Sequence, residues 1–272
     1  MGQESRAGKF DTLVEESVSK SVDEMVIVTS QISTIEAVIE SLNTSDEIPH
    51  QIKLITDRDT LKAADSNFII SSRLNQYFEE GVLNIRSHPG DHPTALFVKS
   101  DEVTFVHETT ADEGILMSSG DEDVVIAVRE KYISQWKNGR RFQLSKPSYA
   151  RMLESIGQDL GESMQESIQS VFESAGLTSR DGEQLDEVYV YLLMAARNKQ
   201  QFYDLCSWGE DMGVASRAKF SKQKRALEEA GLIETEKVPT DVGRPRQRLV
   251  LAKDSLKNAS SAEIVQVSQS VL

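Results

Sequence analysis

Short apolar runs along the first half of the chain alternate with amphipathic stretches of helical period. Residues 25–29 and 52–56 are apolar runs of strand length, and residues 33–42 between them repeat apolar positions every three or four residues. This order predicts a strand, a helix and a strand, which together form a βαβ unit. Ser33 followed by Glu36 has the spacing of a helix-capping box. A second helical stretch follows residue 57 and ends at Gly81.

The next segment predicts a sheet with further strands and one closing helix. Apolar runs over residues 82–87, 94–99 and 102–107 predict strands, and residues 114–117 predict another. Residues 121–137 have helical spacing, and the side chains expected to pack on the sheet are Val125, Val128, Ile133 and Trp136. We therefore expect an α/β (α+β) regulatory domain over about residues 10–145.

A different pattern begins after Pro147. Apolar residues recur every three or four positions between Tyr149 and Phe172, among Glu, Gln, Asp and Ser. This spacing predicts one long amphipathic connector helix within residues 146–178. Its apolar stripe has two explanations, which the sequence leaves open. The stripe packs either on its own chain or against the same helix of a second copy, and we expect a homodimer through the region between Tyr149 and Phe172.

The last part of the chain predicts three short helices followed by two strands. The helices are expected over residues 185–196, 201–211 and 216–230, with Ser216 as the N-cap of the third. A glycine turn at Gly213 separates the second helix from the third. This order is typical of a winged helix-turn-helix, which we place at residues 181–254 with a C-terminal tail over 255–272.

The charge distribution sets this last segment apart. The chain of 272 residues contains 30 Lys and Arg against 44 Asp and Glu, a net charge of −14. Residues 216–253 contain ten basic and five acidic residues, so this window carries +5 while the rest of the chain carries −19. A basic segment on an acidic protein indicates a surface that faces a polyanion, although a solvated charged face is the plainer explanation.

The cations of this segment define the expected DNA-contacting residues. On the third helix they are Arg217, Lys219, Lys222 and Arg225, to which we add Ser221. Three arginines of the hairpin, Arg244, Arg246 and Arg248, alternate in a strand, so they share one face while Leu249 and Leu251 share the other. Double-stranded DNA is the expected partner, and a protein-docking module is the alternative.

Two sequence motifs give this segment a family resemblance. LEEAGLIE at residues 227–234 and GRPR at 243–246 resemble the winged helix-turn-helix of bacterial and archaeal transcription regulators. The resemblance implies that the third helix enters the major groove of DNA.

The first domain also resembles a known superfamily. Residues 92–99 resemble the phospholipase D motif, His-x-Lys followed by four residues and Asp; His92 matches, but Thr94 replaces the lysine and Lys99 the aspartate. Without these groups a histidine nucleophile lacks its partners, so catalysis is not expected. The domain is similar to the regulatory domain of TrmB-type archaeal sugar regulators, and the whole chain resembles the haloarchaeal TbsP family.

That resemblance implies a sequence-specific regulator of metabolic (sugar or gluconeogenic) genes, with a small-molecule metabolite as a possible effector. The acidic composition agrees with a halophile. A phosphodiester- or nucleotide-handling enzyme targeted to DNA is the rival hypothesis, and the degenerate motif argues against it.

Other chemistry has little support in the sequence. No nucleotide-binding glycine loop, GxSxG or HExxH motif is present, so we expect no catalytic residues and no cofactor. We expect no metal site, since the only candidate ligands, the four histidines, lack a diagnostic spacing. The single cysteine, Cys206, and the absence of a long apolar run favour a cytoplasmic chain with no membrane segment. Cys206 is expected to be a packed thiol rather than a redox sensor.

Overall fold

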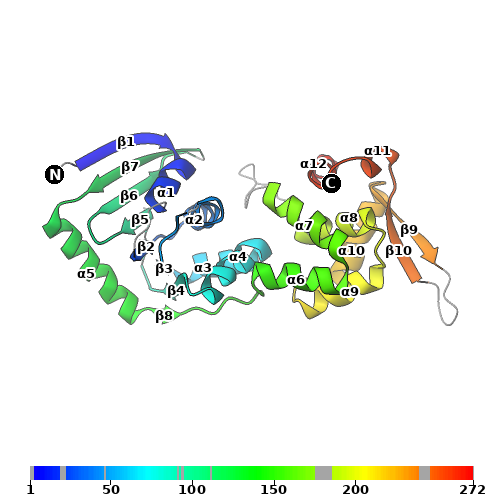
Figure 1. The fold of residues 1–272 in the computed structure, drawn as a ribbon, viewed down its shortest axis with the longest axis horizontal. Coiled ribbons are helices and arrows are strands. Elements are labelled where there is room, and N and C mark those ends of the chain that lie inside the picture. Colours follow the sequence, from blue (N-terminus) through cyan, green and yellow to red (C-terminus); the bar gives the residue numbers. More distant parts are fainter. Residues whose placement is uncertain are drawn as a thin grey trace. The chain divides into compact units, whose positions relative to one another are not determined.

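The computed structural model forms two compact units, residues 1–148 and 149–272. It describes residues 3–18, 23–45, 47–90, 92, 95–110, 112–174, 186–238 and 246–271. The ribbon in Figure 1 shows the first unit as a sheet with helices and the second as a mainly helical body with one hairpin. Within the described ranges, no helix combines the length and the apolar character needed to cross a membrane.

The first unit is built on an eight-stranded sheet of order β1-β7-β6-β5-β2-β3-β4-β8. Its elements are β1 (Gln3–Lys9), α1 (Phe10–Val18), β2 (Glu24–Val28), α2 (Ile32–Thr44), β3 (Gln51–Thr56), α3 (Arg58–Ser66), α4 (Phe68–Glu79), β4 (Leu83–Ser87), β5 (Ala95–Val98), β6 (Val103–Glu108), β7 (Glu113–Ser119), α5 (Glu122–Asn138) and β8 (Arg140–Arg141). Strands β2, β3 and β4 pair in parallel, and all other neighbours pair antiparallel. The predicted βαβ unit and the α/β class are confirmed.

Helix α5 covers one face of this sheet. Val125 is buried against strand residues that include Val26, Leu96 and Val103. Val128, Ile133 and Trp136 pack against the same cluster, as the helical spacing predicted. Helices α1 to α4 lie on the opposite face, where Ile52 and Leu54 of β3 meet apolar residues of α2 (Figure 1). Apolar burial on both faces explains why β2 is a continuous apolar run from Met25 to Val28.

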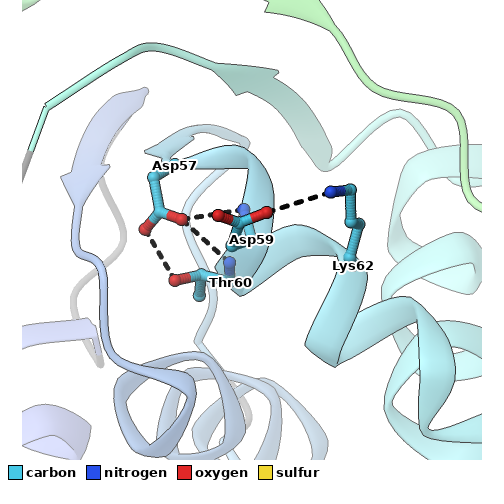
Figure 2. Close-up of polar contacts among 4 residues, drawn as sticks. All are labelled: Asp57, Asp59, Thr60 and Lys62. Atoms are coloured by element: carbon cyan, nitrogen blue, oxygen red, sulfur yellow. Dashed lines mark hydrogen bonds and ion pairs between the residues drawn. The ribbon is translucent and has the colours of Figure 1, made fainter.

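The step from β3 into α3 is fixed by an aspartate cap (Figure 2). Asp57 Oδ1 accepts hydrogen bonds from the backbone N–H groups of Asp59 at 2.8 Å and Thr60 at 2.9 Å. Oδ2 accepts a third bond from the Thr60 hydroxyl at 2.6 Å. Burial alone would raise the pKa of Asp57, but these hydrogen bonds outweigh it and lower the pKa. Lys62 donates to Asp59 across 3.0 Å on the outer side of the same turn.

Several features of the first unit differ from the sequence-based expectations. The helical stretch expected between residue 57 and Gly81 is divided into α3 and α4, which meet at Asn67. Strand β1 and helix α1 were not predicted, and β1 pairs with β7 along its whole length, from Gln3–Ser119 to Lys9–Glu113. The capping box expected at Ser33 is wrong, because α2 begins at Ile32 and its N-cap position is occupied by Gln31. The Ser33 hydroxyl instead donates to Glu108 Oε2 across 2.8 Å, which joins α2 to the end of β6.

The second unit contains a winged helix-turn-helix. Its elements are α6 (Tyr149–Asp159), α7 (Glu162–Ser174), α8 (Glu187–Arg197), α9 (Phe202–Asp211), α10 (Arg217–Glu229), β9 (Ile233–Val238), β10 (Arg246–Leu251), α11 (Asp254–Lys257) and α12 (Ser261–Gln269). Helices α8 to α10 and the β9–β10 hairpin confirm the predicted order of three helices and a wing. Helix α12 packs against α7 and α8, and its Ile264 is fully buried, so the expected C-terminal tail contains a helix of this unit.

The expectation of a single long connector helix is wrong. The chain breaks between α6 and α7 at Gly161, whose φ of +97° lies in the left-handed region that favours glycine. The N–H groups of Leu160 and Gly161 both donate to the carbonyl of Ile156, at 2.9 and 3.0 Å, and close the end of α6. The two helices therefore fold back on each other and form a hairpin.

The apolar stripe of these helices is buried within its own unit. Met152, Ile156, Met164 and Ile168 are each 0% exposed. The ring of Phe172 contacts Tyr191 of α8 edge-on at 6.0 Å, and the indole of Trp208 donates to Ser155 at 3.1 Å. This corrects the expectation that the region between Tyr149 and Phe172 forms the homodimer interface. Its apolar side chains already form the core between α6, α7 and the winged helix.

Candidate nucleic-acid interface

Helices α9 and α10 meet across a tight turn that fixes the angle between them. Phe220 and Leu227, seven residues apart on the inner face of α10, are both 0% exposed. The ring of Phe220 lies directly on Gly209 of α9, where a Cβ atom would approach the ring's Cζ to 2.6 Å. Gly213 has a φ of +67° in the turn. The small residue at position 209 therefore lets the two helices come close, as a helix-turn-helix requires.

The start of α10 is capped as the sequence predicted. The Ser216 hydroxyl accepts a hydrogen bond from the backbone N–H of Lys219 at 3.3 Å. N-terminal residues of a recognition helix are the ones that contact base edges, so this cap also fixes the part of α10 that would face DNA.

One face of α10 is open to solvent and basic. Ser221, Lys222 and Arg225 are exposed, and their spacing places them on neighbouring turns of one helix face. Within the described part of the chain, the side chains of Lys222 and Arg225 form no ion pair and no hydrogen bond. We name these three residues the α10 stripe. Its cations are available to an external anion.

Arg217 is held at the beginning of this stripe by helix α9. Its Nε donates to Glu210 Oε2 at 2.6 Å, and its guanidinium lies 5.2 Å from the ring centre of Tyr203. The hydrogen bond with Glu210 raises the pKa of Arg217. The guanidinium remains half exposed, so it keeps a fixed position while staying accessible.

Lys219 makes contacts on another side of the helix. Its Nζ lies 2.8 Å from Asp186 and 3.9 Å from Glu187, at the start of α8. Burial alone would lower the pKa of Lys219, but the hydrogen bond to Asp186 and the nearby carboxylates outweigh it and raise the pKa. This lysine joins α10 to α8, and the structure does not bring it together with the α10 stripe.

The wing has the two faces that the alternation predicted. Arg246 and Arg248 share one face, while Leu249 and Leu251, both buried, share the other. Arg246 Nη1 donates to Gln201 Oε1 at 3.0 Å, and Arg248 stands opposite Glu236 in the ladder. The third arginine, Arg244, lies outside the described residues. Arg246 and Arg248 therefore both lie near polar residues of their own unit.

Sequence reasoning missed two polar residues of the wing. Lys237 and Gln247 are directly paired across the hairpin and are both exposed. They share the face of Leu249, which is the face whose Thr235 hydroxyl donates to Glu228 of α10 at 2.5 Å. The strand period predicts this placement, because positions 233, 235 and 237 lie on the same face of β9.

The degenerate phospholipase D-like motif does not form one cluster. The backbone N–H of His92 donates to Ser30 Oγ at 3.0 Å, and its ring lies 6.4 Å from Tyr132. Lys99 is at the other end of β5, where its ammonium is 2% exposed and 4.0 Å from Glu102. Thr94 lies outside the described residues. Among the residues that the structure describes, no group of three or more His, Cys, Asp or Glu side chains could hold a metal ion.

Comparison with protein families agrees with both units. Residues 3–147 match the family described as transcriptional regulator TbsP-like, N-terminal, and residues 148–269 match its C-terminal HTH domain. The chain belongs to the TbsP-like transcriptional regulators. Membership of the TbsP-like family makes the second unit a helix-turn-helix DNA-binding domain and the whole chain a transcriptional regulator. No curated protein matches the chain by sequence.

Solved structures resemble the chain only weakly. TrmBL2, an archaeal chromatin protein, is 14% identical with a TM-score of 0.35 over 51% of this chain, and the chain spans only about half, 54%, of TrmBL2. Nuc, a phospholipase D family member from Salmonella typhimurium, is 12% identical with a TM-score of 0.35, over 52% of this chain and 99% of Nuc. NucT from Helicobacter pylori is 10% identical with a TM-score of 0.37, over 52% of this chain and 100% of NucT. Scores this low carry no argument about function.

Proposed function

We propose that the chain recognises specific promoter sequences in double-stranded DNA through α10 and the wing, and so controls metabolic genes. The observation that carries this proposal is the α10 stripe: two exposed cations on one face of a capped helix, which form no ion pair or hydrogen bond within the described chain. A protein-docking winged helix would have no need to leave these charges unpaired on an acidic protein. The family resemblance to sugar regulators supports the metabolic targets.

The same proposal assigns separate roles to the contacting residues. Ser221, Lys222 and Arg225 contact base edges in the major groove, because they are the exposed polar side chains of α10. Arg217 flanks them and contacts a phosphate, whereas Lys219, held by Asp186 and Glu187, would have to leave these carboxylates to do so. Arg244, Arg246 and Arg248 of the wing contact the neighbouring backbone or minor groove, and contribute affinity more than sequence preference.

We further propose that the regulator acts in the cytoplasm of a halophile as a homodimer whose first unit binds a small-molecule effector. Two-fold symmetry matches the paired half-sites that helix-turn-helix proteins recognise. The interface lies outside the buried α6–α7 stripe. Light scattering at the salt concentration of the cell should give the mass of two chains, and a single-chain mass would contradict the dimer.

The first unit is proposed to be non-catalytic. The motif positions of the lysine and the aspartate are occupied by Thr94 and Lys99, so a nucleophile at His92 lacks the groups that phosphodiester chemistry requires. A catalytic phosphodiesterase would also require a base or a cation beside the histidine. Hydrolysis of a phosphodiester substrate that disappears on His92→Ala substitution would favour the rival enzyme hypothesis.

Immunoprecipitation of the protein with its genomic DNA, followed by sequencing, tests the DNA-binding proposal. Wild-type protein should recover discrete promoter sites, and Lys222→Ala/Arg225→Ala should lose them. The matched control is Lys137→Ala/Arg151→Ala, which removes two exposed cations outside the α10 stripe. Loss of sites in both double variants would indicate a general charge effect, and recovery of no discrete sites by the wild type would contradict the proposal.

A further inference from the structure

A cleft of about 650 Å³ opens in the first unit, at the edge of the sheet formed by β4 and β8. Helix α4 contributes Phe78, β4 contributes Asn84 and Arg86, α5 contributes Trp136, and the segment from β8 onward contributes Arg141 and Phe142. Its volume falls in the range of about 300–1,000 Å³ that is typical of small-molecule sites. The α10 stripe belongs to the other unit, so this cleft is a separate candidate site.

Two arginines stand directly opposite each other in this cleft. Arg86 of β4 pairs with Arg141 of β8 in the antiparallel ladder, which places both side chains on one face. Like charges in this position are destabilising unless a counter-charge lies between them. One carboxylate, Glu79, lines the cleft, and it accepts a bond from Asn75 at 3.4 Å. The two guanidinium groups therefore leave the cleft with a surplus of positive charge on an acidic protein.

The two arginines differ in how firmly they are held. Arg86 Nη1 donates to the carbonyls of Trp136 at 2.7 Å and Lys137 at 3.2 Å, and the guanidinium lies 4.8 Å from the centre of the Trp136 ring. Arg141 is exposed, and its side chain forms no ion pair with any residue that the structure describes. Arg86 is thus a fixed cation, and Arg141 is an exposed one without an ion pair among the described residues, so the two can bind an anion together.

Aromatic side chains form the other walls. Phe78 is 48% exposed although it is a large apolar residue, and it lines the cleft with Trp136 and Phe142. Exposed aromatic faces can stack on the ring of a ligand, and the neighbouring amide of Asn84 can form hydrogen bonds with the polar groups of that ring. The cleft combines a stacking surface with a cationic end.

We propose that this cleft binds a phosphate monoester of a ring compound, with the phosphate between Arg86 and Arg141 and the ring against Phe78. Two guanidinium groups match the double negative charge of a phosphate monoester better than the single charge of a carboxylate. The ring belongs to a sugar or to a nucleoside, and both offer a face to the aromatic wall. This inference deepens the effector part of the proposed function, and its regulatory meaning rests on that function.

Isothermal titration calorimetry of the full chain without DNA tests the site directly. The probes are inorganic phosphate, glucose 6-phosphate, adenosine monophosphate, and the matched carboxylate glucuronate. At least one ring phosphate should bind more tightly than both inorganic phosphate and glucuronate, and its identity distinguishes the sugar from the nucleoside. Arg141→Ala should weaken that ligand at least about tenfold, or about 1.4 kcal/mol. Arg140→Ala, the exposed neighbour that does not line the cleft, should leave binding within about twofold of wild type.

Phe78→Ala separates the two parts of the site. It should weaken the ring phosphate but not inorganic phosphate, because it removes only the stacking surface. Absence of binding by every phosphate probe would overturn the inference, as would equal losses in Arg141→Ala and Arg140→Ala. A gel shift without ligand measures DNA binding independently. Operator binding without phosphate binding would overturn only the cleft, and phosphate binding without any operator would overturn only the proposed function.

Discussion

Glu210 of α9 holds Arg217 of α10 through two hydrogen bonds at once. The Arg217 side chain donates to Oε2 at 2.6 Å, and its backbone N–H donates to Oε1 at 3.2 Å. One carboxylate therefore spans the turn of the helix-turn-helix and satisfies a backbone donor at the start of α10. We therefore expect the charge of this carboxylate to contribute to the stability of the helix-turn-helix.

The first prediction concerns the pH dependence of that contact. The backbone hydrogen bond from Arg217, followed by its side chain, lowers the pKa of Glu210. A lowered pKa in the folded state adds stability above the ordinary pKa of glutamate, and this stability is lost as the pH falls through the lowered value. Glu210→Gln should therefore melt below wild type at neutral pH and approach it in acid. Thermal melts at several pH values measure this, with Glu229→Gln as the control, and a constant difference would contradict it.

The second prediction concerns the close approach of α9 and α10. Gly209→Ala forces its Cβ against the Phe220 ring, which is fully buried and cannot move aside freely. Overpacking of this kind costs about 1–3 kcal/mol, so we expect a lower melting temperature and weaker DNA binding. Gly157→Ala is the matched control, because its Cβ meets only the end of the Gln165 side chain. Equal melting temperatures for the two variants would refute the packing argument.

The third prediction follows from the burial of the α6–α7 stripe. Ile156→Ala should destabilise the second unit by about 2–5 kcal/mol, because it removes a fully buried side chain. The mass in solution should stay that of the wild type as long as the unit is folded. Circular dichroism melts and light scattering on the same sample test both statements, with exposed Glu166→Ala as the control. A folded variant that has dissociated would restore this stripe as an interface.

Local signals explain why the winged helix-turn-helix was predictable from the sequence. Ser216 caps α10, Gly213 makes the turn, and Phe220 and Leu227 are seven residues apart on the buried face. Each of these signals acts within a few residues, so the sequence pattern alone contains it. The exposed positions of Lys222 and Arg225 follow from the same helical period.

Contacts between distant residues explain what the sequence did not predict. Strand β1 is polar, with Ser5, Arg6 and Lys9, and it forms because β7 offers a partner more than a hundred residues away. The break at Gly161 depends on a positive φ that helical spacing does not reveal, since the apolar period continues across it. The ion pair of Lys219 with Asp186 likewise needs α8 and α10 to be packed first.

The fourth prediction concerns the single cysteine. Cys206 is buried in α9, and this burial raises its pKa to about 11. The reactive thiolate is therefore scarce near neutral pH, so a disulfide reagent should label the native protein slowly and the denatured protein fast. The rate of thiol labelling with and without denaturant measures the difference. Fast labelling of the native state would favour the redox sensor over the packed thiol.

The fifth prediction concerns salt, because the basic DNA-facing segment and the acidic remainder act in opposite directions. A basic DNA-binding protein loses affinity as salt rises, with a logarithmic slope of about −0.9 for each phosphate neutralised. Here the −19 charge outside residues 216–253 repels DNA at low ionic strength. At about 0.01 M salt the Debye length is about 30 Å, and near 1 M it is about 3 Å.

Salt should therefore remove the long-range repulsion before it weakens the proposed close contacts of Lys222 and Arg225 with DNA. We expect specific binding to fall only slightly between dilute and molar KCl, or to improve. Self-repulsion within the acidic chain is screened too, so the melting temperature should rise over the same range. Fluorescence anisotropy with labelled operator DNA measures the slope, and Lys222→Ala/Arg225→Ala should lower affinity across the whole range. A steep and continuous loss of specific binding with rising KCl would contradict the halophilic adaptation and leave the helix-turn-helix assignment intact.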